Sequence, residues 1–232
     1  MKMAQLKNEK PLKELFERLT TSHAELTGNG PLTAKKYRKG QTIFQQGSIP
    51  KGAHYIKSGW VKISRVDGNG NEKVLRLVTK NQFIGHLSLI KKWDYLSTAV
   101  AVTDCEIFFI AKQVFFELLQ KDNTFASLVI EMLADELVET ETHLDTLLTK
   151  NIQERIANLL LSLEQSSDAD PTFNDSLIRL PKKDLAAIVN ITPETLSRHL
   201  KMLDDEGLID NNKNHIELLN RNELLKKSNL VD

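Results

Sequence analysis

The stretch that decides the fold is residues 180–209, which read LPKKDLAAIVNITPETLSRHLKMLDDEGLI. It predicts two short helices. Pro181 suits the first position of a helix, because the N–H that proline lacks has no partner there. Thr192 followed by Pro193 predicts the N-cap and first residue of the second helix, and Gly207 predicts its end. Apolar residues recur at helical spacing in both helices and predict a buried face, namely Leu185, Ala186, Val189, Leu196, Leu200 and Leu203.

The opposite face of the second helix is polar. Its residues at i, i+3, i+4 and i+7 are Glu194, Ser197, Arg198 and Lys201. In a DNA major groove, an arginine can donate two hydrogen bonds to guanine, and a glutamate can accept one from cytosine. The alternative interpretation is a solvated face on an ordinary helical hairpin.

The residues after the second helix favour the DNA-binding interpretation. Residues 208–209, 210–214 and 215–218 read as a strand, a polar turn and a second strand. A hairpin in this place makes the segment a winged helix-turn-helix. The residues that we predict to contact DNA are Lys182, Thr192, Glu194, Thr195, Ser197, Arg198 and Lys201.

Composition sets limits on the size and charge of the protein. The chain has 232 residues, of which 41% are hydrophobic and 27% charged, enough for one large or two modest globular domains. Lysine plus arginine and aspartate plus glutamate both number 31, so bulk charge does not indicate a nucleic-acid partner. Any DNA affinity must come from a local basic patch, to which Arg179 and Lys183 can add.

Several kinds of site are excluded. Cys105 is the only cysteine, so an internal disulfide and a four-cysteine metal site cannot form. The charges of Asp104 and Glu106 would raise the pKa of its thiol, which favours a small buried residue over a redox switch. No catalytic or metal-binding motif occurs, so we expect no enzyme. No apolar run has the length of a signal peptide or a membrane span, so we expect a cytoplasmic protein without a membrane partner.

Residues 39–110 have a different pattern, in which short alternating runs are separated by glycines. The runs are residues 42–44, 54–56, 60–64, 74–78 and 99–102. Regularly spaced strands of this kind predict a sandwich or barrel, and residues 67–71 between two of them predict a hairpin turn.

Helical periodicity returns from Ala111 and predicts a short helix followed by a long one. The apolar stripe of the long helix exceeds what its own domain needs, which favours a two-helix coiled coil at a dimer axis. The alternative is that the stripe only packs against the strands. The residues predicted to make the dimer are Phe125, Leu128, Met132, Leu137, Leu144 and Leu148.

The order of these parts resembles the transcription regulators of the cAMP receptor protein and FNR (CRP/FNR) family across nearly the whole chain. The resemblance is carried by RKGQTIFQQG at 38–47, YIKSGWVK at 55–62, FIG at 83–85, TDCE at 103–106 and ETLSR at 194–198. It implies an α+β fold in three parts. These are an N-terminal double-stranded β-helix (β-roll) of the cyclic-nucleotide-binding type over 1–121, a central dimerisation helix over 122–150 and a C-terminal winged helix-turn-helix over 151–232.

The resemblance also implies a homodimer that binds an inverted repeat in double-stranded DNA. Glu194 and Arg198 match the pair that reads a G·C base pair in this family, and Ser197 matches the FNR-type pattern Glu-x-x-Ser-Arg. We therefore predict an operator near TTGAT-N4-ATCAA rather than one built on TGTGA. Residues 165–175 lie where family members can touch RNA polymerase, a further candidate partner.

The sensor departs from the family pattern where a cyclic nucleotide would bind. Members that bind one use Phe-Gly-Glu, whose carboxylate holds the ribose, and a later arginine that pairs with the cyclic phosphate. Here His86 takes the glutamate position, and Tyr95 or Leu96 takes the arginine position. The lost bidentate pair leads us to expect no cAMP binding in the usual way. The effector-pocket candidates are Gly85, His86, Leu87, Tyr95, Ser97 and Thr98.

His86 has two interpretations. As a haem ligand in a nitric-oxide or redox sensor, it would need an apolar cavity and a second ligand, for which His143 or a methionine of the long helix is a candidate. The alternative is a hydrogen-bonded histidine at a strand end. The cysteine cluster of oxygen-sensing family members is absent. An alternative of another class is a cyclic-nucleotide-like module that regulates a protein partner without binding DNA.

Overall fold

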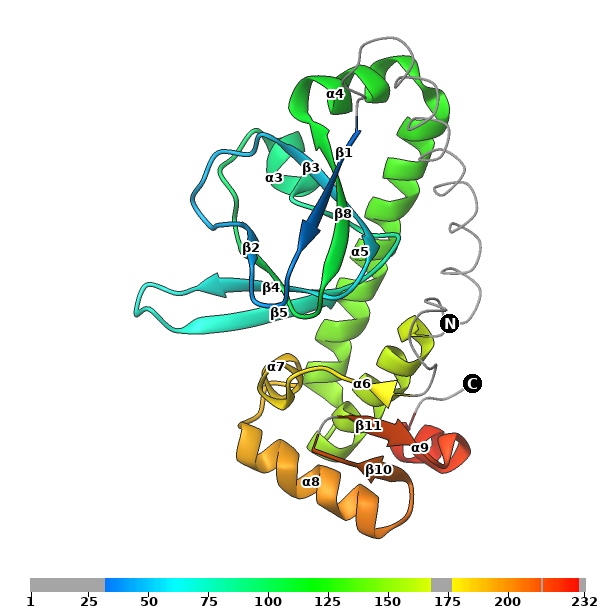
Figure 1. Cartoon of the computed structure of the whole chain (residues 1–232). Coiled ribbons are helices and arrows are strands. Elements are labelled where there is room, and N and C mark those ends of the chain that lie inside the picture. Colours follow the sequence, from blue (N-terminus) through cyan, green and yellow to red (C-terminus); the bar gives the residue numbers. More distant parts are fainter. Residues whose placement is uncertain (1–31, 168–176, 214, 230–232) are drawn as a thin grey trace. The chain divides into compact units, whose positions relative to one another are not determined.

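The structure is a computed structural model that describes residues 32–167, 177–213 and 215–229 (Figure 1). The chain divides into two compact units, residues 1–140 and residues 141–232, and each is described by itself. Of the residues predicted to touch RNA polymerase, residues 168–175 lie outside the described residues. Among the helices that are described, none combines the length and apolar composition needed to cross a bilayer.

The first unit contains two antiparallel sheets that form the predicted β-roll (Figure 1). One sheet has the order β1 (Leu32–Tyr37), β8 (Cys105–Ala111), β3 (Gly52–Ser58) and β6 (Phe83–Ile84). The other has the order β2 (Thr42–Phe44), β7 (Thr98–Ala101), β4 (Val61–Val66) and β5 (Glu72–Val78). Strand β1 lies before residues 39–110, the region where the sequence predicts strands. The sequence does not predict it, because most of its side chains are exposed and its apolar pattern is weak.

The core of this unit consists of two clusters of buried residues, one on each face of the sheet that contains β8. Ile107 faces the interior between the sheets, where it packs with Ile56, Val61 and other buried residues. Ile110 faces the other side of the same sheet and packs with Phe115 of α4 (Lys112–Lys121). Because successive side chains of a strand point to opposite faces, one strand serves both layers.

The long helix α5 (Asn123–Thr149) matches the expected element, but its apolar stripe is divided between two roles. Phe125, Leu128 and Met132 are buried in the core of the first unit, so these three do not offer the dimer surface predicted for them. By contrast, Leu137 is 59%, Leu144 55% and Leu148 76% exposed. The structure thus supports core packing for the first turns and leaves the later turns of the helix uncovered.

The second unit is a winged helix-turn-helix, as the sequence predicts. Its helices are α6 (Ile152–Ser167), α7 (Lys182–Ile188), α8 (Pro193–Asp205) and α9 (Arg221–Ser228). Its sheet has the order β10 (Ile209–Asn211), β11 (Ile216–Leu218) and β9 (Leu177–Ile178), and all pairs are antiparallel. Strand β10 extends into residues expected to form the turn, and Pro181 is the N-cap of α7 rather than its first residue.

Candidate functional site

Two hydroxyl groups fix the start of α8. The side-chain oxygen of Thr192 accepts a hydrogen bond from the backbone N–H of Thr195 at 3.2 Å, and the two threonine hydroxyls lie 3.1 Å apart. Such a cap satisfies one of the N–H groups that lack an intrahelical partner. Thr192 and Thr195 therefore orient the helix, besides being candidates for contacts with DNA.

The turn before α8 and the end of α8 both use left-handed backbone. Asn190 has a φ of 54°, which asparagine tolerates better than most residues. Gly207 has a φ of 68°, and its N–H donates to the carbonyl of Asp204 at 2.8 Å. The next N–H, that of Leu208, donates to the carbonyl of Leu203 at 2.9 Å, so the last turn of α8 is closed.

The faces of α8 separate as predicted. Leu196, Leu200 and Leu203 are buried, which holds the helix against its own unit. On the opposite face, the exposed polar residues are Glu194, Ser197, Arg198 and Lys201. No side chain of these four makes a hydrogen bond or ion pair with another described residue, so their side-chain donors and acceptors remain available to a ligand.

The wing is tied to both helices through Asn211 of β10. The Nζ of Lys182 on α7 donates to Oδ1 of Asn211 at 2.7 Å, and the backbone N–H of Asn211 donates to Oδ1 of Asp204 at 3.1 Å. Lys182 was predicted to contact DNA, and here its half-buried ammonium positions the wing. Arg179 and Lys183 are both exposed and lie close to it in sequence.

In the first unit, a buried group of ionisable side chains joins three elements. His86 is the first residue of α3 (His86–Lys91), a short helix that was not predicted and that directly follows β6. Its Nε2 lies 3.3 Å from Oε2 of Glu136 on α5, and Nη2 of Arg76 on β5 lies 3.3 Å from Oε1 of the same carboxylate. Neither ring nitrogen of His86 makes an aligned hydrogen bond among the described residues, so the contact is a close approach of imidazole to carboxylate.

The carboxylate of Glu136 is the centre of this group. Burial acts to raise the pKa of Glu136, and the neighbouring His86 and Arg76 outweigh it, so the pKa lies below its usual value. A buried carboxylate that stays ionised needs such partners, because desolvation otherwise favours its neutral form.

Tyr95 belongs to the interior of the roll. Its ring stacks on Phe44 with centroids 4.0 Å apart, and its hydroxyl donates to the carbonyl of Gly52 at 3.2 Å. Gly85, with a φ of 77°, lies against the same ring, since a Cβ there would come within 2.8 Å of Cε1 of Tyr95. The structure therefore brings Gly85 and Tyr95 together, and the phenol ring covers the glycine.

The other effector-pocket candidates lie in different surroundings. Leu87 is exposed, whereas His86 is fully buried against Glu136. The hydroxyl of Thr98 accepts the backbone N–H of Gln46 at 3.1 Å, and Ser97 is half-buried.

The residues present fit neither a cyclic nucleotide held in the family manner nor a haem on His86. The arginine position carries an aromatic ring that packs on Phe44, and the exposed Lys91 instead places its Nζ 5.0 Å from the ring centroid of Trp93. The His86 imidazole is enclosed, with Nε2 directed to a carboxylate. His143 belongs to the other unit.

Cys105 is buried, as predicted, although the main cause of its raised pKa differs from the expected one. Burial raises the pKa of the thiol to about 11, and the charge of Asp104 adds to it. Its Sγ lies within 3.4 Å of the carbonyl oxygens of Trp60 and Thr103. A thiol with this pKa is protonated at neutral pH and is a weak nucleophile.

We expect Glu136→Gln to lower the free energy of unfolding by about 2 to 3 kcal/mol, because His86 and Arg76 lose their buried carboxylate. Urea titration at neutral pH measures this. The exposed Glu131→Gln on the same helix is the control, with an expected change below about 0.5 kcal/mol. Because the pKa of Glu136 is depressed in the folded state, its contribution is present above the unfolded carboxyl pKa and is lost as pH falls through the folded pKa. Equal stability of the two variants would contradict the assigned role.

Comparisons with known proteins follow the same division of the chain. Residues 34–122 match the model of the cyclic nucleotide-binding domain, and residues 154–227 match that of the Crp-like helix-turn-helix domain. The cAMP-activated global transcriptional regulator CRP of Salmonella typhimurium is 30% identical over 175 residues, which cover 75% of this chain and 83% of the relative.

Solved structures show the same fold. FixK2 from Bradyrhizobium japonicum has a TM-score of 0.76 at 21% identity, with 87% of this chain and 99% of that chain covered. A transcriptional regulator of the CRP/FNR family from Thermus thermophilus has a TM-score of 0.71 at 24% identity, with 84% and 98% covered. Together with the matched domains and the 30% identity to CRP, the winged helix and the β-roll show that the chain belongs to the CRP/FNR family of DNA-binding transcription regulators.

Proposed function

We propose that the protein acts in the cytoplasm as a homodimeric regulator, not an enzyme, and that it reads an inverted repeat near TTGAT-N4-ATCAA through α8. The observation that carries this proposal is the exposed face of α8, on which the side chains of Glu194, Ser197 and Arg198 have no partners among the described residues. Polar side chains at one helix face, next to a wing, suit the major groove and the adjacent phosphates.

Each residue of that face has a distinct role in the proposal. Arg198 donates two hydrogen bonds to guanine O6 and N7, while Glu194, one turn earlier, accepts from the N4 amino group of cytosine. Ser197 is small enough to allow close approach of a thymine methyl group or a phosphate. Lys201 and Lys183 contact phosphates, which adds affinity without sequence information.

We expect Arg198→Ala to weaken binding to the TTGAT inverted repeat about 10- to 100-fold and to relax the preference for guanine at one position, because a bidentate base contact is lost. Fluorescence anisotropy with matched and mutated duplexes measures both effects. Lys201→Ala is the comparison variant, which should weaken all sequences alike and reduce the salt dependence by about one ion. Operator binding unchanged by Arg198→Ala would contradict the role given to this residue, and absence of binding by the parent protein would favour a regulatory module that does not bind DNA.

The homodimer is proposed to form along the uncovered side of α5. Exposed positions recur there at alternating spacings of four and three residues, the spacing of a coiled-coil seam. They are Ile130, Ala134, Leu137, Glu141, Leu144 and Leu148. A second copy of the helix would cover the four large apolar side chains of this seam, which explains why they are apolar although exposed in one chain.

We expect Leu144→Asp to weaken self-association at least tenfold, because the seam would bury a carboxylate without a partner. Sedimentation equilibrium measures the monomer and dimer populations. Glu131→Lys is the control, since it changes a charge on α5 at an exposed position outside the seam. If both variants remain as dimeric as the parent protein, the seam lies elsewhere.

The sensor is proposed to act without cAMP, through the contact of Glu136 with α3 and β5. A ligand can shift DNA binding only if it prefers one conformation of the protein, so it must reach an element that has two arrangements. Helix α3 is such a candidate, because His86 connects it to the helix that carries the proposed dimer seam. RNA polymerase is the remaining proposed partner.

A further inference from the structure

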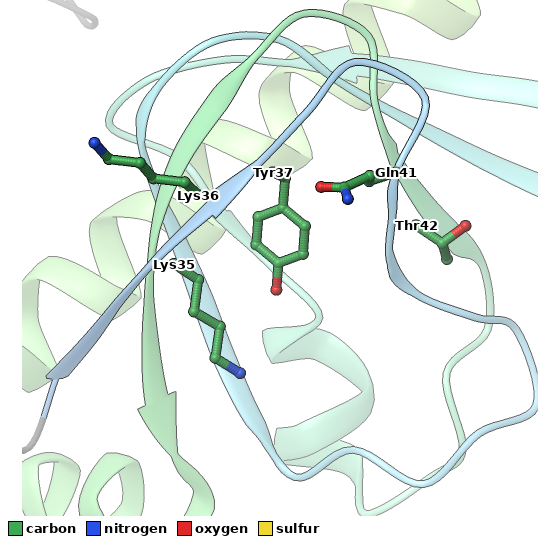
Figure 2. A pocket seen from close by; sticks show the side chains of 5 residues that line it. All are labelled: Lys35, Lys36, Tyr37, Gln41 and Thr42. Carbon is green, nitrogen blue, oxygen red and sulfur yellow. The ribbon is translucent and has the colours of Figure 1, made fainter.

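A pocket of about 510 Å³ opens beside the first strand of the β-roll. Its lining residues are Lys35, Lys36, Tyr37, Gln41 and Thr42 (Figure 2). The volume lies within the range of small-molecule sites, about 300 to 1,000 Å³. The residues come from β1 and from the start of β2, not from the segment between Gly85 and Tyr95 where the family resemblance would place a nucleotide.

The turn beside the pocket is held in place by hydrogen bonds. Oε1 of Gln41 accepts the backbone N–H of Arg38 at 2.6 Å, and the N–H of Lys39 donates to Oδ1 of Asp104 at 2.8 Å. The N–H of Gly40 donates to the carbonyl of Ala101 at 2.8 Å. This anchoring to neighbouring elements gives the pocket a defined rim.

Lys35 and Tyr37 present a cation and a hydroxyl on the same side of β1, whereas Lys36 points to the other side (Figure 2). The Nζ of Lys35 lies 4.5 Å from the ring centroid of Phe109. Lys35 has no carboxylate partner among the described residues. An ammonium beside an aromatic face and a phenol is suited to an anion attached to an apolar body.

His54 is a buried polar side chain next to the same Phe109 ring. Its ring lies 5.1 Å from that of Phe109, and the side chain is buried. Burial, together with the charge of Lys35, lowers the pKa of His54 to about 4, so the ring is neutral at pH 7. Its Nδ1 is buried and has no hydrogen-bond partner among the described residues, a state that is costly and uncommon in folded proteins.

We propose that this pocket binds a small organic anion, whose carboxylate or phosphate pairs with Lys35 and the Tyr37 hydroxyl and whose body packs on Phe109 toward His54. In this proposal the pocket is the ligand site of the sensor. Anion binding itself does not depend on the proposed function, but its effect on DNA binding does. The ligand class replaces the cyclic nucleotide, whose place in the roll interior is filled by Tyr95 and Phe44.

The test titrates the full-length protein with inorganic phosphate, citrate and benzoate, each to about 10 mM, and follows backbone amides of residues 35–42 and the His54 ring by NMR. Saturable shifts at these positions with at least one probe are expected, and the probe that binds distinguishes phosphate from carboxylate ligands. Lys35→Met should weaken that binding about tenfold or more, because a charge-assisted contact is lost.

Lys112→Met is the matched control, since this exposed lysine of α4 does not line the pocket, and it should change the affinity less than about twofold. Absence of saturable shifts with all three probes, or equal weakening by both lysine variants, would overturn the proposal. Operator binding by the same protein samples is measured alongside. If no anion binds but the operator is still bound, only the proposed anion site is contradicted. If neither the anions nor the operator is bound, the proposed function is contradicted as well.

Discussion

The first unit depends on one buried carboxylate, that of Glu136, because it links the long helix to two separate elements of the roll through charged contacts. Apolar residues of α5 such as Phe125 also pack against the sheet, but apolar contacts by themselves can slide or repack. The contacts of Glu136 with His86 and Arg76 resist such movement, since moving any member costs free energy by leaving a charge or an imidazole buried without its counterpart. The register of the helix on the roll is thereby specified.

The interior of the roll is largely occupied by the protein's own aromatic rings. Tyr95 stacks on Phe44 and covers Gly85, so the place associated with a nucleotide in cAMP-activated relatives is filled from within. Next to these rings, Nδ1 of the buried His54 has no hydrogen-bond partner among the described residues, and Lys35 at the pocket on β1 has no carboxylate partner among them. The chain therefore has the β-roll of its family, with aromatic side chains in the interior of that roll.

The parts of the fold that follow local rules were predictable from the sequence. The cap at Thr192, the end at Gly207 and the leucine spacing of α8 each depend on residues within one or two turns. Contacts between residues far apart in the sequence could be found only from the structure. Examples are the ion pair of Arg76 with Glu136 and the hydrogen bond from Lys182 to Asn211. Periodicity marked α5 as apolar but could not divide it, because whether a stripe faces its own core or a partner depends on tertiary packing. For the same reason the sequence does not predict α3, and it predicts only a DNA contact for Lys182, not the hydrogen bond to Asn211.

The most direct test of the account is selection of duplexes bound by the untreated protein from a random DNA pool, followed by sequencing. The exposed Glu194, Ser197 and Arg198, on a helix with a fixed start and end, predict enrichment of an inverted repeat with TTGAT half-sites about one helical turn apart. Enrichment of TGTGA half-sites would contradict the role given to Ser197, and the absence of any enriched sequence would contradict the central claim that α8 reads DNA in this form of the protein.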